Sequence, residues 1–298
     1  MITIIVFTTV SELSEYSLDG TTFTEGTTSP WGTSMVDSGF LFVAVAHGTN
    51  GAATPFYYYS TDGRTWDSGS LPSTSYWNSV GYGAGVFAAV ASFTDAAYSG
   101  DGITWTATTM PSSGSWVGVS FGTGIFVCVN YSSAIGAYSS DGITWTATAM
   151  PSSTTWSTTA FGSGKFVALD RSNNGSYSSD GITWTGVTLP VSAPWLWCAF
   201  GNGTFVAVPY GGTTGIYSTD GITWFSMTMP ANLYWSVVLY SSDVGKFIAF
   251  AQGSNVVGYS SDGITWTSAS NLLAANSWRA AAFRSTSPST TTKIVMMV

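Results

Sequence analysis

The sequence predicts an all-β fold built from repeated units, and three observations lead to this prediction. A phrase of the form Tyr-Ser-x-Asp-Gly-x-Thr-Trp/Phe, as at residues 138–145, recurs seven times along the 298 residues. A second tryptophan follows the phrase at a nearly constant interval, and no segment has the apolar spacing of an amphipathic helix. Repetition with a period near 40 residues is typical of folds in which each unit packs on its neighbours.

The aspartates of the repeated phrase define the units and span the whole chain. They are Asp19, Asp62, Asp101, Asp141, Asp180, Asp220 and Asp262, at intervals of 43, 39, 40, 39, 40 and 42 residues. Because the seven copies leave no room for another unit of comparable size, we expect residues 1–298 to form one domain.

Each unit has the pattern of four short strands. In the unit around Asp141 these are an innermost strand at 116–121, a deeply buried second strand at 125–129, a third at 136–140 and an outermost at 143–150, which a proline ends. The Asp-Gly pair between the third and outermost strands is a hairpin signal, since glycine adopts positive φ without penalty. Four strands in about 40 residues, repeated around an axis, predict a β-propeller of seven blades.

The two ends of the chain supply complementary parts of one blade. Residues 15–26 read as a third and an outermost strand, and residues 277–283 read as an innermost strand. The segments 2–7 and 293–298 compete for the second strand. We favour 293–298, because it follows the innermost strand directly, and we expect this shared blade to close the ring.

The repeated phrase resembles the Asp-box of bacterial neuraminidase repeats, with one residue fewer between the Asp and the Gly. It is more similar to the short variant in neuraminidase-like propeller repeats, including photosynthetic assembly factors and phage-tail repeat proteins. The resemblance implies the fold and a structural role for the box. An aspartate before a glycine turn can accept hydrogen bonds from the amides of its own turn, so we expect one staple in each blade.

Composition excludes several classes of function. Charged residues make up 7% of the chain and the net charge is −8, so the basic surface of a nucleic-acid-binding protein is missing. No apolar run is long enough for a membrane span, and the first ten residues are a poor signal peptide. Seven of the fifteen acids are box aspartates, which concentrates negative charge on one rim. We interpret Cys128 and Cys198 as buried free thiols.

No catalytic, metal or cofactor site can be assembled from the sequence. His47 is the only histidine, which gives no support for a Ser-His-Asp triad or a histidine metal site. The arginines, Arg64, Arg171, Arg279 and Arg284, do not form the constellation that a neuraminidase uses. We therefore predict a protein that is not an enzyme, with a sialidase-like glycoside hydrolase as a remote alternative.

We expect ligands to bind at one end of the ring. The loops between second and third strands vary most, and they share that end with the start of every innermost strand. We call this end the loop face and the opposite end, which carries the boxes, the box face. The candidate ligand-binding residues are Phe56, Tyr57, Phe93, Tyr131, Asp170, Arg171 and Tyr210.

Seven tryptophans begin the innermost strands at the loop face: Trp31, Trp77, Trp116, Trp156, Trp195, Trp235 and Trp278. They fit either inter-blade packing, which their regular spacing favours, or a ring of platforms for sugars. Trp197 lies on the same side of its strand as Trp195, so we expect it to pack in the core.

The function that fits these features best is non-enzymatic binding or a structural role. The resemblance points to a phage virion, in a tail or on a capsid surface, where the propeller would contact a host surface glycan or neighbouring virion proteins. A secreted lectin-like propeller is the alternative. We expect a virion or extracellular location, without nucleic acid or membrane insertion.

Overall fold

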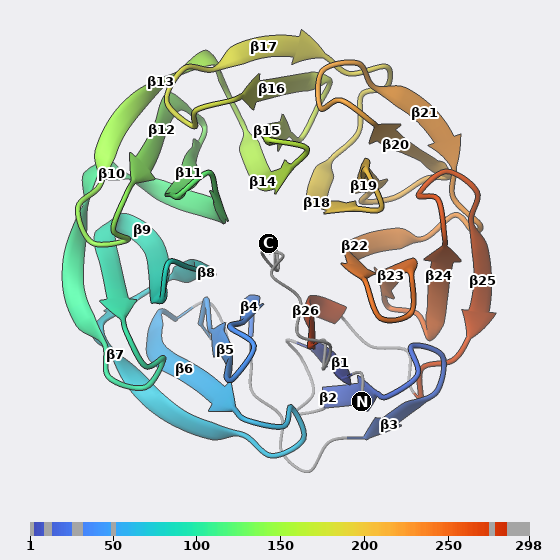
Figure 1. The fold of residues 1–298 in the computed structure, drawn as a ribbon, viewed down its shortest axis with the longest axis horizontal. Helices are drawn as coiled ribbons and strands as arrows, with labels where there is room; N and C mark the ends of the chain where they lie inside the picture. The colour runs from blue at the N-terminus through green and yellow to red at the C-terminus, as the bar shows by residue number, and fades with distance from the viewer. Residues whose placement is uncertain (1–2, 9–13, 26–31, 49–51, 274–277, 285–298) are drawn as a thin grey trace.

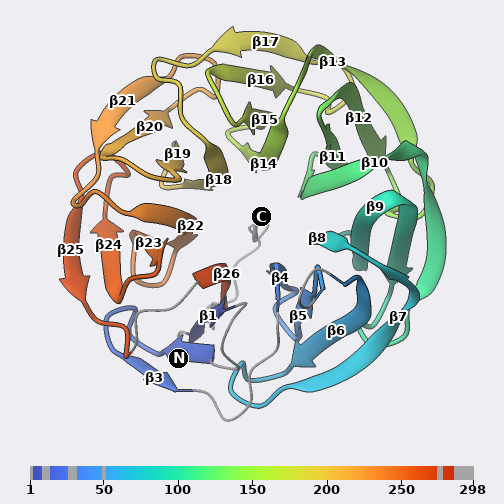
Figure 2. The same cartoon turned by 180° about the vertical axis from the view of Figure 1, so that it is seen from behind.

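The chain folds into small antiparallel sheets arranged around a central axis, the arrangement of a β-propeller. The computed structural model describes residues 3–8, 14–25, 32–48, 52–273 and 278–284, and every regular element in these residues is a strand. Figure 1 shows β8, β14, β18, β22, β26 and β4 nearest the axis, and Figure 2 shows the same ring from behind. The predicted all-β, propeller-like fold is confirmed.

Five of the sheets have four strands each. One has the order β4-β5-β6-β7 (Ser34–Asp37, Phe42–Val45, Thr54–Ser60, Asp67–Ser75). Three more follow the same pattern: β14-β15-β16-β17 (Trp156–Gly162, Lys165–Asp170, Asn174–Ser178, Thr185–Thr188), β18-β19-β20-β21 (Trp195–Gly201, Thr204–Pro209, Thr214–Ser218, Phe225–Thr228) and β22-β23-β24-β25 (Tyr234–Ser241, Lys246–Gln252, Val256–Ser260, Thr267–Ser270).

The sixth sheet has six strands in the order β13-β12-β11-β10-β9-β8. They are β8 (Trp77–Gly83), β9 (Val86–Ser99), β10 (Thr106–Gly122), β11 (Ile125–Tyr131), β12 (Ser133–Ser139) and β13 (Thr146–Thr154). The first part of β10 pairs with the end of β9, and its last part pairs with β11. One long strand thus runs from the outer side of one group of strands to the inner side of the next.

The remaining sheet is built from both ends of the chain, in the order β26-β1-β2-β3. Its strands are β26 (Trp278–Arg284), β1 (Thr3–Thr8), β2 (Ser14–Ser17) and β3 (Phe23–Glu25). Our preference for 293–298 as its second strand is wrong, because β1 occupies that place: Ile5 lies opposite Ala282 on one side and Tyr16 on the other. Residues 293–298 lie outside the described part. The N-terminal segment is joined to β2 by a short connection, which favours antiparallel pairing.

Every box turn has the same hydrogen bonds. In the box of Asp141, Oδ1 accepts from the Ile143 and Thr144 amides at 2.8 Å each, and the Ser139 hydroxyl donates to the same oxygen at 2.8 Å. Equivalent bonds occur at Asp19, Asp62, Asp101, Asp180, Asp220 and Asp262. Each aspartate therefore holds the turn that joins its third and outermost strands.

The outermost strand of the Asp141 unit differs from the prediction at both ends. β13 begins at Thr146 rather than at residue 143, because the Asp141 carboxylate holds Ile143 and Thr144 in the turn. It also continues through Pro151 to Thr154 instead of ending at the proline. A proline is tolerated there because an edge strand has amides that face no partner.

Neighbouring sheets meet at a repeated joint of one glycine and one aromatic ring. At the end of β10, a Cβ added to Gly122 would lie 2.2 Å from Cγ of Phe161 on β14. Gly162 faces Phe200 and Gly201 faces Tyr240 in the same way, and Gly83 on β8 faces Phe121 on β10 within the six-stranded sheet. The ring from the next sheet thus occupies the space that a side chain would need, which brings the innermost strands close together.

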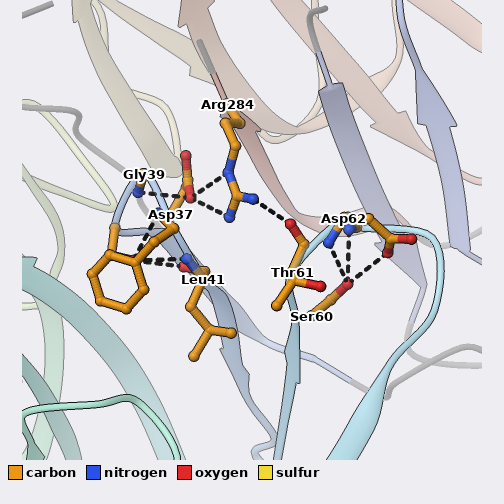
Figure 3. Close-up of polar contacts among 10 residues, drawn as sticks. Asp37, Gly39, Leu41, Ser60, Thr61, Asp62 and Arg284 are labelled. Atoms are coloured by element: carbon orange, nitrogen blue, oxygen red, sulfur yellow. Dashed lines mark hydrogen bonds and ion pairs between the residues drawn. The ribbon is translucent and has the colours of Figure 1, made fainter. Parts of the chain in front are cut away.

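The joint between β26 and β4 has neither the glycine nor the aromatic ring, and Figure 3 shows it. Where β26 meets β4, the glycine place is taken by Arg284, and the aromatic place on β4 is taken by Val36. Arg284 donates to Oδ1 of Asp37 from Nε at 3.0 Å and from Nη2 at 2.8 Å, and to the Thr61 carbonyl from Nη1. Its guanidinium lies 4.0 Å from the centroid of the Phe42 ring. A buried ion pair therefore connects the sheet of both termini to its neighbour.

Candidate functional site

The candidate site is a pocket on the loop face between three sheets. It has a volume of about 240 Å³ and is lined by Thr33, His47, Asn78, Ser115, Val117, Gly118, Tyr131, Ser157 and Arg171. Most of these residues begin innermost strands or follow second strands, which is why the fold gathers residues from 33 to 171 in one place. Of the predicted ligand-binding residues, Tyr131 and Arg171 line this pocket.

Tyr131 and Arg171 form a stacked pair at its edge. Tyr131 ends β11 and Arg171 follows β15, so each lies on the loop between a second and a third strand. The Arg171 guanidinium lies 5.2 Å from the centroid of the Tyr131 ring, while the Arg171 side chain is exposed and Tyr131 is half-buried. The contact holds an aromatic ring and a positive charge together on the lining of the pocket.

Two hydroxyl groups of the pocket, those of Thr33 and Ser157, donate to the scaffold. Thr33 donates to the Trp77 carbonyl at 3.1 Å, and Ser157 donates to the Trp195 carbonyl at 2.5 Å, each across to the neighbouring sheet. The Asn78 amide donates to the Trp116 carbonyl at 3.1 Å, within the six-stranded sheet. Each hydroxyl has a single hydrogen to donate, and Thr33 and Ser157 use theirs within the protein. A ligand therefore meets lone pairs at these two oxygens.

His47 lies at the side of the pocket next to β26. Its ring is tilted against Tyr76, with centroids 4.7 Å apart. Desolvation lowers the pKa of His47 from its usual value, and the charge of Arg279 lowers it further. Arg279 does not line the pocket, and its buried Nε has no hydrogen-bond partner within the described residues.

Asp170, which directly precedes Arg171 in the chain, is buried and contributes no accessible carboxylate. Its Oδ2 accepts from Thr154 at 2.5 Å, Ser172 at 2.6 Å and Asn174 at 2.7 Å, and its Oδ1 accepts from the Ser172 and Asn174 amides. Burial alone would raise the pKa of Asp170, but these hydrogen bonds outweigh it and hold the pKa below its usual value. The residue shapes the β15–β16 loop, so we do not include it among the ligand contacts.

The other predicted site residues lie away from the pocket. Phe56 on β6 is 46% exposed, and Phe93, in the middle of β9, is 63% exposed with φ at +64°. Tyr57 is buried, and its hydroxyl donates to the Ile103 carbonyl at 2.5 Å, so its ring belongs to the packing between sheets.

Tyr210 forms a second aromatic pair, with a residue that sequence reasoning missed. Its ring centroid lies 5.1 Å from that of Tyr234, which is 58% exposed, and its hydroxyl donates to Oε1 of Gln252 at 2.5 Å. Tyr234 directly precedes the tryptophan of its innermost strand, as Tyr76 does beside His47. The position directly before the first tryptophan of an innermost strand could therefore have been used to predict an aromatic residue on the loop face.

The tryptophans that begin the innermost strands are part of the core. Those on the described residues are fully buried, and each indole N–H donates to a backbone carbonyl, as Trp116 does to Ser112 at 3.0 Å. The others are Trp77, Trp156, Trp195, Trp235 and Trp278. Trp197 is also buried, and Trp31 lies outside the described residues. These six are packing residues rather than ligand platforms.

The described residues offer no arrangement for metal binding. No group of three or more His, Cys, Asp or Glu side chains within them is placed to hold an ion. Cys128 and Cys198 are free and buried, and burial raises the pKa of both thiols. No helix in the described part of the chain is suited by length and apolar character to span a membrane.

Comparisons with known proteins bear on the fold alone. No family model matches the chain, and no curated protein matches it. A catalytically inactive virginiamycin B lyase from Staphylococcus aureus with quinupristin is similar in structure, with a TM-score of 0.71, 10% identity, and 92% of this chain and 90% of the other covered.

Two further solved structures are similar to this chain in their fold. A putative 6-phosphogluconolactonase from Bacteroides uniformis has a TM-score of 0.70 and 10% identity, over 95% of this chain and 99% of the other. YCF48 bound to a D1 peptide has a TM-score of 0.60 and 17% identity, over 80% and 81%. At these identities the likeness supports the propeller-like arrangement and no shared activity.

Proposed function

We propose that this protein is a non-enzymatic binding propeller that holds a sugar on its loop face, in the pocket beside Tyr131 and Arg171. We further infer a ring of seven blades with four strands each. The five four-stranded sheets supply five blades, and the six-stranded sheet supplies two, because β9 and β10 each fill two strand positions.

The observation that carries the proposal is the Tyr131–Arg171 pair over a polar pocket. Sugars have apolar faces that stack on aromatic rings, and hydroxyl rims that need hydrogen-bond partners. The exposed guanidinium supplies donors, and the Thr33, Ser115 and Ser157 oxygens supply acceptors on the lining. The pocket is small, so we expect weak binding at each site and firm attachment only when several copies act together.

The residues that line the pocket support a non-enzymatic role. An acid–base mechanism needs two titratable groups at the reacting bond, and glycoside hydrolysis uses two carboxyl groups. No carboxylate is among the lining residues, and the nearby Asp170 is buried and fully hydrogen-bonded. Two of the structural neighbours are named as a lyase and a putative lactonase. The experiment therefore has to include a test for enzymatic activity.

The setting that we propose is a phage virion, in a tail or on a capsid surface, where the ligand is a host surface glycan. The resemblance of the boxes to phage-tail repeats supports this setting. A neighbouring virion protein is the second candidate partner. The YCF48 structure that resembles this chain holds a peptide, which favours a protein partner over an enzyme substrate.

The test is a glycan-binding screen on the purified chain, followed by adsorption to the cells that carry the glycans found. Tyr131→Ala is expected to weaken both by about tenfold, because it removes the stacking surface. Phe225→Ala is the matched control, since that ring is 49% exposed on the outer strand β21, and it should bind like the unmodified protein. Absence of binding to every glycan and cell, or release of reducing sugar, would refute the proposal.

A further inference from the structure

We propose that the loop-face pocket selects sugars that carry a carboxylate, that is, hexuronate residues of an acidic polysaccharide. This inference rests on the proposed function and names the ligand class for the same site. It follows from three features of the pocket: its charge, the committed hydrogens of its hydroxyl groups, and its aromatic edge.

The charge of the pocket is opposite to that of the whole chain. The net charge is −8, and the seven box aspartates lie on the box face. Arg171 is the one permanently charged residue on the lining, which includes no acid. Since Asp170 is fully hydrogen-bonded inside the loop, it does not supply an exposed partner for this guanidinium.

A second guanidinium strengthens the same preference. Arg279 on β26 lies near enough to His47 to lower the pKa of that imidazole. Its Nε is buried without a hydrogen-bond partner in the described part of the chain. A carboxylate that entered the pocket beside Arg171 would form charge-assisted hydrogen bonds, which are stronger than neutral ones.

The hydroxyl groups of the lining determine which hydrogen-bonding groups the ligand needs besides its carboxylate. Thr33 and Ser157 donate their hydrogens to carbonyls of the neighbouring sheets, so they present lone pairs to the pocket. A ligand hydroxyl can donate to them, whereas a simple anion cannot. The Tyr131 ring adds a flat apolar surface. A carboxylate and several hydroxyls on one flat ring are the features of a hexuronate.

The experiment compares each acidic oligosaccharide with its own neutral form. Trimers of galacturonate, glucuronate and mannuronate are titrated calorimetrically against the full chain at low salt, beside their methyl esters, which keep the ring and remove the charge. We expect one of the acids to bind about tenfold more tightly than its ester. The advantage should shrink as salt is added, because screening weakens exposed charge pairs.

Two variants assign the effect to the pocket. Arg171→Gln, at an exposed side chain, should bring the acid and its ester to within about twofold, because it removes the charge that distinguishes them. Lys246→Gln removes the same charge from an exposed position on the opposite face and should change neither affinity. Thermal melts of both variants control for folding.

The remaining outcomes separate this inference from the proposed function. Equal affinity for acid and ester, unchanged selectivity in Arg171→Gln, or no binding of any uronate would overturn the inference. If neutral glycans still bind and depend on Tyr131, the proposed function stands without it. Tighter binding of a tripeptide with a free C-terminal carboxylate than of every uronate would overturn the sugar class.

Discussion

Arg284 on β26 and Asp37 on β4 form an ion pair across the seam between the sheet of both termini and its neighbour. The Asp37 side chain has no exposed surface, that of Arg284 is 15% exposed, and Nη2 lies 2.8 Å from Oδ1. At four other joints the space holds a glycine and an aromatic ring. The seam is thus stabilised by a charge pair in the position where other joints depend on apolar packing.

Breaking this pair should be costly. Arg284→Met leaves the buried Asp37 carboxylate without its cation, and we expect a loss of about 3–5 kcal/mol in the free energy of unfolding. Denaturant titration measures it. Arg64→Met, at a surface arginine that also stacks on a ring, should cost less than about 1 kcal/mol. If both variants lost the same amount, the seam would have no special role.

The box aspartates should contribute stability and no binding. Asp141→Ala and Asp180→Ala each remove the acceptor of two turn amides, so we expect losses of about 1–2 kcal/mol. Glycan binding should stay unchanged, because the boxes lie on the opposite face from Tyr131. Calorimetric melts measure the expected loss of stability, and the binding titration measures glycan affinity separately. A stable variant that no longer binds would place a site on the box face.

The same carboxylates make stability depend on pH in the acid range. Backbone hydrogen bonds lower the pKa of Asp101 and of Asp180 from 3.8 to about 2. A carboxyl whose pKa is lower in the folded state stabilises the protein above the unfolded pKa, and this stability is lost as the pH falls through the folded value. Melting temperature should therefore decline steeply between about pH 4 and pH 2. A flat profile in that window would contradict these shifts.

The glycine joints should not tolerate a methyl group. Gly122→Ala places a Cβ 2.2 Å from Cγ of Phe161, so either the ring or the strand has to move. We expect a loss of about 1–3 kcal/mol, measured by denaturant unfolding. Gly100→Ala is the control, since an added Cβ there meets no atom within 4 Å. Equal stability of the two variants would show that the sheets are not closely packed at this joint.

Removal of residues 1–25 should abolish cooperative unfolding. β1 pairs with both β26 and β2, so its loss leaves the innermost strand of that sheet without its neighbour. We expect a broad transition, or none, in a thermal melt followed by circular dichroism. A single sharp transition at the original temperature would show that this sheet is dispensable for closure.

The repeat predicted the propeller-like architecture well, because every unit contains the residues of the box turn and the residue alternation of its strands. The box phrase located all seven turns, and Asp141 shows the expected contacts. The choice between two end segments for the closing sheet failed, since both were apolar and pattern alone does not rank them. Tyr131 and Arg171 were singled out separately, but their stacking depends on the paths of two loops forty residues apart.

The pairing of β1 with β26 has a consequence for biosynthesis. The first strand leaves the ribosome some 270 residues before the strand that will lie beside it. At about 5–20 residues per second, β1 waits roughly 15–60 s with one edge unsatisfied. An unpaired edge recruits other chains, so nascent molecules on one messenger are at risk of joining each other. The same contact that seals the finished ring makes its assembly sensitive to the rate of translation and to chaperone supply.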